Sequence, residues 1–361
     1  MCLYPKRYIN KKYTATEKNG GVVPAPPIIG TDDSGQPIYD KRVLYIEIPC
    51  GQCEECRKQK TREWQVRLTE ELKNWKYPYF ITLTFSPKEL EELCQKSRLG
   101  ECNALCAYAV RHMLERYRKD HKKSLRHWLI TELGHEGTER IHMHGLLFSN
   151  EPLKFEETKE KDFYTWKYWK YGMIYVGNYC TLRTINYIVK YINKIDEDHK
   201  GFNGQILASP GIGSQWLQTL KNKTIEYKYK PHESKDYYLL PNGKKIKLPK
   251  YYKNKIYSES EKELIWRDFM DRNEETIAGN TYNQITTDSE TIGVIYDKAR
   301  KINKQLGYGD NSKEWRKKPY NITKQMLQRN IKKKEEWEAL PLEIKITYNR
   351  LKLKEILFEK K

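Results

Sequence analysis

The sequence predicts an α+β protein, and three observations support this class. Two apolar, strand-like runs, 127–133 and 141–148, are separated by turn-forming residues and so predict a hairpin. A third run, 79–85, is rich in β-branched and aromatic residues and predicts another strand. Apolar positions recur at helical spacing over 56–75 and again over 101–121. Strands and amphipathic helices therefore alternate along the chain.

The composition favours a single-stranded nucleic acid as the partner. The 361 residues allow one catalytic domain plus appendages. Lys and Arg number 67 against 48 Asp and Glu, and the net charge of +19 suits a polyanion. The 28 Tyr and 9 Trp interleave with the lysines, as in proteins that stack single-stranded bases. No apolar run reaches the roughly 18 residues of a membrane span, and we expect no signal peptide and a reducing cytoplasm.

The N-terminal region is notable for its cysteines. Residues 1–42 read as an exposed extension, and 43–48 as a strand. The strand leads to three thiols at two-residue spacing, Cys50, Cys53 and Cys56. In a reducing compartment such a group predicts a structural zinc site, which needs a fourth ligand. That ligand is Cys2 or, as alternatives, Cys94, Cys102 or Cys106, and three free thiols in a loop remain the competing interpretation.

Two helices and a strand follow the cysteines. The helix over 56–75 has an apolar face formed by Trp64, Leu68, Leu72 and Trp75. Its basic residues are expected on or near the outside: Arg57, Lys58, Lys60, Arg62 and Arg67. The strand over 79–85 ends at Ser86-Pro87. The helix over 101–121 is expected to bury Ala107, Val110, Leu114 and Tyr117.

The predicted hairpin carries a candidate metal site. His142 and His144 stand at positions i and i+2 of a strand, so both imidazoles point to one face. Folding the hairpin brings Glu132 opposite one of them. Two imidazoles and one carboxylate that leave coordination positions open favour a catalytic metal site over a closed structural one. A pair of hydrogen-bonded histidines without a metal is the alternative.

A second candidate stretch lies about forty residues downstream. The aromatic and lysine-rich segment 163–171 reads as a cationic aromatic patch, and 173–177 as a short strand. If 184–194 is a helix, four side chains fall on one stripe: Tyr187, Lys190, Tyr191 and Lys194. The alternative is an amphipathic packing helix, but a buried face rarely alternates tyrosine with lysine.

The catalytic signals end near residue 200. We expect an endonuclease domain over 43–200, a basic loop and hairpin region over 201–257, and a charged helical tail over 258–361. The hairpin is predicted from 237–240 and 246–249, and the most basic part of the tail is Lys332-Lys333-Lys334. No phosphate-binding loop motif occurs, which argues against a fused ATP-driven helicase.

Together these groups predict attack by a tyrosine phenol on a phosphodiester of single-stranded DNA. Tyr187 and Tyr191 are the candidate nucleophiles, with Lys190 and Lys194 as neighbouring cations. A free phenol has a pKa of about 10, so nearby metal and lysine charge would help it to react as an oxyanion. The products would be a 5′-phosphotyrosine and a 3′-hydroxyl that can prime a polymerase.

Several separate motifs carry a resemblance to known families. Residues 80–85, His142-Met143-His144 and the two-tyrosine segment 187–191 resemble the motifs of the HUH endonucleases. More narrowly, 1–5, 49–57 and 209–213 resemble the replication initiators of microviruses, the gokushovirus-like single-stranded DNA phages. Because the third metal ligand varies in position across the superfamily, His135 and Glu136 stay alternatives to Glu132.

The resemblance implies an RRM-like fold, a central antiparallel sheet flanked by helices with the metal hairpin in its middle. It implies a rolling-circle initiator that nicks and rejoins the phage origin with Mg²⁺ or Mn²⁺ in the host bacterial cytoplasm. A host helicase and DNA polymerase would unwind and copy the strand. A relaxase or transposase would use the same motifs, a non-catalytic single-stranded DNA-binding protein would need only the basic and aromatic residues, and a zinc hydrolase would leave no covalent adduct.

Overall fold

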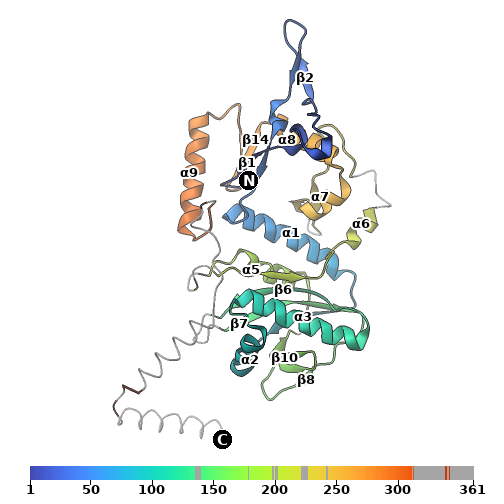
Figure 1. The fold of residues 1–361 in the computed structure, drawn as a ribbon, viewed down its shortest axis with the longest axis vertical. Helices are drawn as coiled ribbons and strands as arrows, with labels where there is room; N and C mark the ends of the chain where they lie inside the picture. The colour runs from blue at the N-terminus through green and yellow to red at the C-terminus, as the bar shows by residue number, and fades with distance from the viewer. Residues whose placement is uncertain are drawn as a thin grey trace.

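A seven-stranded antiparallel sheet forms the centre of the computed structural model, as the α+β prediction requires (Figure 1). The structure describes residues 1–134, 140–177, 179–196, 199, 202–220, 227–240 and 243–310, with isolated positions 312, 338, 339 and 341. The strand order is β11-β6-β7-β5-β10-β9-β8. The strands are β5 (Tyr77–Leu83), β6 (Arg126–Leu133), β7 (Ile141–Ser149), β8 (Glu156–Glu157), β9 (Phe163–Trp166), β10 (Trp169–Val176) and β11 (Ile206–Ala208).

The predicted hairpin is the middle of this sheet. β7 pairs with β6 on one side and with β5 on the other. Glu132 lies opposite His142, and Thr82 lies opposite His144. Gly145 permits the close pairing, since a Cβ there would lie 2.4 Å from the carbonyl oxygen of Trp128. The register therefore places the two histidines and the glutamate on one face of the sheet.

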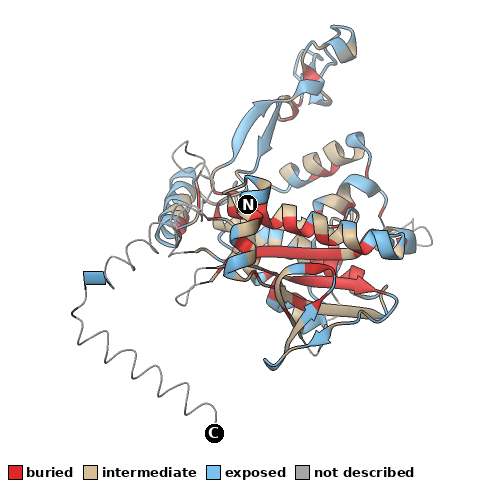
Figure 2. Cartoon of the chain, turned by 60° about the horizontal axis from the view of Figure 1, so that its bottom comes forward, coloured by how far each residue is buried: buried red, intermediate tan, exposed pale blue. Residues whose placement is uncertain are grey.

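Helices cover both faces. One face packs on α2 (Pro87–Ser97) and α3 (Cys102–His121), and the other on α1 (Glu54–Leu72), α4 (Leu182–Ile188) and α5 (Lys190–Asn193). Alternate residues of β6 divide between the two cores: Leu129 and Leu133 face α3, whereas Trp128 and Ile130 face α1 and α4. Figure 2 shows the buried residues concentrated in the sheet and the adjoining faces of the helices. Glu132 has the parity of Trp128 and Ile130 and so lies on the α1 side.

The aromatic segment 163–171 is not the surface patch that the sequence predicted. Trp166, Tyr168 and Trp169 are all buried in the core beside α3. Their polar atoms have partners there: Trp169 Nε1 donates to Thr84 O at 2.9 Å, and the Tyr168 hydroxyl donates to Asp120 at 2.9 Å. Large rings gain most from burial when their polar end is paired. These three rings are therefore unavailable for stacking on DNA bases.

The first 42 residues form more structure than the predicted loop. β1 (Lys6–Ile9) pairs with β4 (Tyr45–Ile48), and β2 (Ile28–Thr31) pairs with β3 (Pro37–Tyr39). All four strands are exposed, and the β2–β3 hairpin projects from the molecule at the top of Figure 1. Three short 3-10 helices complete this part, η1 (Lys11–Tyr13), η2 (Glu17–Asn19) and η3 (Lys41–Leu44). Without buried apolar alternation these strands gave no clear sequence signal.

The remaining elements form two smaller cores beside α1. The first contains α6 (Gln215–Leu220), the predicted hairpin of β12 (Tyr237–Leu239) and β13 (Lys245–Lys247), α7 (Lys250–Ile256) and the start of α8 (Glu259–Asp271). The second contains α9 (Ser289–Gln305) and a hairpin that the sequence analysis missed, β14 (Glu274–Ile277) with β15 (Asn280–Asn283). Residues 332–334 lie outside the described part of the chain. No helix in the described ranges is both long and apolar enough to span a bilayer.

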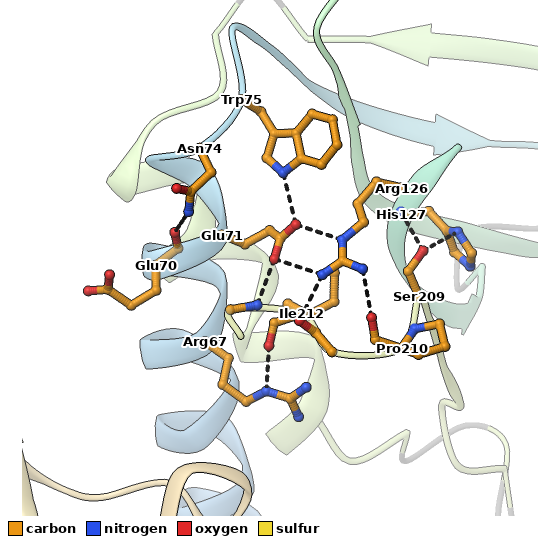
Figure 3. A network of polar contacts seen from close by, with 12 residues as sticks. Arg67, Glu70, Glu71, Asn74, Trp75, Arg126, His127, Ser209, Pro210 and Ile212 are labelled. Carbon is orange, nitrogen blue, oxygen red and sulfur yellow. Dashed lines mark hydrogen bonds and ion pairs between the residues drawn. The ribbon is translucent and has the colours of Figure 1, made fainter. Parts of the chain in front are cut away.

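A buried carboxylate joins α1, β6 and the loop 209–213 (Figure 3). Glu71 accepts hydrogen bonds from Arg126 at 2.7 and 3.1 Å, from the indole of Trp75 at 2.8 Å and from the backbone of Gly213 at 2.6 Å. Arg67 is also held inward, because it donates to Ile212 O at 3.0 Å and lies between the rings of Trp64 and Tyr251. The prediction that Arg67 lies outside is therefore wrong.

Candidate active site

Three ligand-type side chains meet at the end of the β6–β7 hairpin. His144 Nε2 lies 2.9 Å from Glu132 Oε2, and His142 Nε2 lies 3.5 Å from the same oxygen. The two Nε2 atoms are 3.1 Å apart. Adjacent ligands of an octahedral ion with bonds of about 2.1 Å are about 3.0 Å apart. The donor set, two imidazoles and a carboxylate on one face, therefore fits a divalent cation with open positions.

Partners on the far side of each ring support this arrangement. His142 Nδ1 lies 3.1 Å from the backbone oxygen of Arg140, and His144 Nδ1 lies 2.9 Å from Thr82 Oγ1. Such bonds fix the orientation of a metal-binding imidazole and turn its Nε2 lone pair toward the ion. Thr82 was not singled out in the sequence, although its position opposite His144 follows once β5 and β7 are paired. The rival ligands His135 and Glu136 lie outside the described residues.

The site favours a charged carboxylate and neutral imidazoles. Burial opposes ionisation of Glu132, but hydrogen bonds to His142, His144 and Lys194 outweigh it and hold the carboxyl pKa far below its usual value. Burial lowers the pKa of His144. The ammonium of Lys194 pairs directly with Glu132 Oε1. These are the protonation states that a cation requires of its ligands.

Both candidate nucleophiles lie next to this group. The rings of Tyr191 and His144 are stacked, with centres 4.6 Å apart and planes at 19°. The two phenol oxygens, Tyr187 Oη and Tyr191 Oη, are 2.7 Å apart. Tyr187 is exposed and packs edge-on against Phe80. Burial, the hydrogen bond to Tyr187 and the charge of Glu132 all raise the pKa of Tyr191. A nearby cation is therefore needed before this phenol can react as an oxyanion.

The tyrosine segment is not the continuous helix predicted over 184–194. A turn at Val189 separates α4 from α5, and Lys194 follows α5 in an extended conformation. The turn still brings Tyr187, Tyr191 and Lys194 together with the triad. Lys190 is exposed, and among the described residues its side chain forms no hydrogen bond or ion pair. The fourth member of the predicted stripe is thus not in contact with the site.

The cysteines gather in a second cluster at the start of α1. Sγ atoms of Cys2, Cys50, Cys53 and Cys56 all lie within 4.8 Å of one another. The Cys50–Cys56 and Cys2–Cys53 sulfur pairs are 3.9 and 4.0 Å apart, near the roughly 3.8 Å edge of a tetrahedral zinc–thiolate site. Backbone amides also donate to these sulfurs, such as Cys50 N to Cys2 Sγ at 3.2 Å.

The alternative fourth ligands lie elsewhere. Cys102 and Cys106 are buried in α3, and Cys94 packs against the same core. That helix runs over Cys102–His121 as predicted, but its buried face is shifted: Val110 and Tyr117 are buried, whereas Ala107 and Leu114 are only half-buried. The shift turns both α3 cysteines into the core and away from Cys50.

Comparisons with known proteins agree with this geometry. The model of the ORF2 family of replication-associated proteins matches residues 78–196, from β5 to just beyond α5. The chain is similar to viral replication-associated proteins. It is 27% identical over 293 residues to replication-associated protein ORF2 of Spiroplasma virus 4, covering 73% of this chain and 86% of that protein.

A second relative supports the same resemblance. Replication-associated protein VP4 of Bdellovibrio phage phiMH2K is 26% identical over 246 residues, or 62% of this chain and 74% of that protein. No solved structure matches the chain. The resemblance to a phage replication initiator that the motifs indicated is thus confirmed, and the matched segment contains Glu132, both histidines and both tyrosines.

Proposed function

We propose that this protein initiates and terminates rolling-circle replication of a phage genome by cutting and rejoining single-stranded DNA at the origin. The observation that carries the proposal is the stacking of Tyr191 on His144, with the Tyr187 phenol 2.7 Å from that of Tyr191. Two potential nucleophiles thereby adjoin a candidate metal site. The similarity to viral replication-associated proteins supports replication over the related relaxase and transposase reactions.

The proposed step is a transesterification at phosphorus. A tyrosine oxygen forms a bond to the phosphorus, and the bond from phosphorus to the 3′-oxygen breaks. The phenol proton leaves to solvent, and the departing 3′-oxygen takes up a proton to become a hydroxyl. Because the phosphotyrosine keeps the energy of the diester bond, a later 3′-hydroxyl can attack it and reseal the strand.

Glu132, His142 and His144 would hold Mg²⁺ or Mn²⁺, and the imidazole nitrogens favour Mn²⁺. When bound, the ion would polarise the scissile phosphate and offset its developing charge. Lys194 adds a second positive charge, since its Nζ lies 5.8 Å from the centre of the Tyr191 ring. Lys190 would act only on the bound strand, because its side chain is exposed.

The four cysteines would hold a structural zinc ion. Cys53 is the N-cap of α1, and Cys2 brings the chain terminus to the same point. The cluster lies in one core with Ile277 of β14 and Ala299 of α9. Zinc there would tie three segments that are distant in sequence and would contribute directly to folding stability.

One experiment tests the proposed reaction. The protein is incubated with Mn²⁺ and 3′-labelled single-stranded oligonucleotides that tile the phage genome strand. The expected result is one oligonucleotide whose label moves to the protein band on a denaturing gel. Cleavage without a covalent adduct would favour a metal hydrolase, and binding without cleavage would favour a non-catalytic DNA-binding protein.

A further inference from the structure

Two side chains from outside the site bind the backbone at the end of α5. Arg57 donates through Nη1 to the carbonyl oxygen of Lys194 at 3.2 Å and through Nη2 to the side chain of Asn203. The Tyr308 hydroxyl donates to the carbonyl oxygen of Asn193 at 3.1 Å. The last carbonyls of a helix have no partner within the helix. Arg57 and Tyr308 supply such partners, and a cation is favourable at this end of a helix.

Arg57 is directed there by the start of α1. It directly follows Cys56 and lies seven residues before Trp64, which places both side chains on one face of the helix. That face packs on α4 and α5, where Gln65 donates to Asn186 at 2.7 Å. The guanidinium carbon also lies 5.9 Å from the centre of the Tyr308 ring. The expectation that Arg57 lies outside is therefore wrong, since it is half-buried.

Tyr308 is held by the same cysteine segment. The amide of Glu54 donates to Asn303 Oδ1 at 2.8 Å, and Asn303 Nδ2 donates to Tyr308 O at 3.3 Å. The amide of Gly309 donates to Gln52 O at 3.2 Å. Asn303 is fully buried, so these bonds are shielded from water. The segment after α9 and the first turn of α1 thus form one body that contacts the end of α5.

The end of α5 sets the position of two groups in the site. Lys194 extends its ammonium to Glu132, and Tyr191, three residues earlier, stacks on His144. A displacement of this backbone would move both side chains relative to the triad. Misplacing a reacting group by about 1 Å can lower a rate by on the order of 100-fold.

We propose that Arg57 and Tyr308 are positioning residues that couple the cysteine cluster to the tyrosine-bearing helix. They hold the carbonyls of Asn193 and Lys194 and thereby keep Tyr191 and Lys194 in register with the metal site. This inference rests on the proposed function, because its effect on rate is read from formation of the covalent adduct.

The test compares Arg57→Met, Arg57→Lys and Tyr308→Phe with the wild type under single-turnover conditions. The maximum rate of adduct formation is expected to fall by on the order of 10-fold in Arg57→Met and Tyr308→Phe, with the half-saturating oligonucleotide concentration unchanged. Arg57→Lys, which keeps a donor, should recover part of the rate. The matched controls are Arg62→Met, on an exposed position of α1, and Tyr4→Phe, whose hydroxyl bonds to Arg300 O instead. Both should behave as the wild type.

Hydrogen exchange supplies a readout that needs no DNA. The amides of 190–195 should exchange faster in Arg57→Met than in Arg62→Met, and faster again after zinc is removed from the wild type. An unchanged maximum rate in Tyr308→Phe and Arg57→Met would overturn the inference, as would a raised half-saturation concentration at unchanged maximum rate, which would make Arg57 a DNA contact. Absence of an adduct with the wild type would instead contradict the proposed function, and unchanged exchange would then contradict this inference separately.

Discussion

Tyr191 lies face to face with His144, and the distance between their ring centres is 4.6 Å. The stack joins the two parts of the site that the sequence places almost fifty residues apart. It also means that a change at the histidine acts on the tyrosine in two ways, through the metal and through packing.

His142→Ala and His144→Ala are both expected to abolish adduct formation and to leave affinity for single-stranded DNA nearly unchanged. Most of that affinity comes from phosphate contacts made by Lys and Arg. The control is His112→Ala, a histidine of α3 that pairs with Glu115. Rates are measured on the denaturing gel and affinities by fluorescence anisotropy. Full cleavage by either variant in Mg²⁺ would contradict the metal-site assignment.

Thr82→Val tests the support of the metal site. The substitution removes the hydroxyl that lies 2.9 Å from His144 Nδ1 while keeping the side-chain shape. Loss of such a partner is expected to weaken Mn²⁺ binding by about 10- to 100-fold. Titration of Mn²⁺ against the adduct rate measures the change. Thr84→Val, which loses a bond to Met173 O instead, should keep the wild-type Mn²⁺ dependence.

Glu71→Gln should destabilise the fold by about 3 kcal/mol, because it leaves a partly buried Arg126 without its charge partner. Burial raises the pKa of Glu71, but bonds from Arg126, Gly213 and Trp75 outweigh it and the net pKa is lowered. A lowered folded-state pKa gives stability that is complete above the unfolded pKa of about 4.3 and is lost as pH falls through the folded value. The difference in melting temperature between wild type and Glu71→Gln should therefore shrink below about pH 4. A constant difference down to acid pH would contradict the ion-pair account, and Glu115→Gln on the surface is the control.

The cysteine cluster is expected to hold zinc after purification without chelator. Metal analysis should find a tightly bound zinc ion that is lost when Cys50, Cys53 and Cys56 are replaced by serine, with a fall in melting temperature. Replacing Cys180, which lies apart from the cluster, should change neither quantity. Zinc-free protein with the same melting temperature in all variants would favour free thiols.

Sequence periodicity predicted the parts of the fold that bury an apolar face. The hairpin register follows from alternation in β6 and β7, and it places Glu132 opposite His142 without further information. The same reasoning failed for 163–171, where tyrosine and tryptophan next to lysine suggested a surface patch but the rings are buried. Composition alone cannot tell a stacking surface from a core whose rings have paired polar atoms.

Long-range contacts were the other gap. Arg57 and Tyr308 lie more than two hundred residues apart, and no local pattern connects either one to Lys194. The turn at Val189 was also missed, because the spacing of the tyrosines fits a continuous helix. Cys2 was among the predicted fourth ligands because a zinc site needs four, but only the folded chain brings it to Cys53.

The tyrosine pair carries a prediction of its own. With ring centres 5.5 Å apart, either phenol could reach one bound phosphate after a small shift. Tyr187→Phe and Tyr191→Phe should each retain some first-strand nicking but fail to release closed circles over repeated rounds. If one variant loses all cleavage and the other circularises at the wild-type rate, the two tyrosines do not alternate.

The most direct test of the central claim is to identify the residue that carries the DNA. The adduct formed with Mn²⁺ is digested with trypsin and nuclease, and the modified peptide is sequenced by mass spectrometry. We expect a nucleotide linked through phosphate to Tyr187 or Tyr191, and no adduct from the Tyr187→Phe, Tyr191→Phe double variant. A nucleotide attached to any other residue, or an adduct that persists in the double variant, would contradict the account.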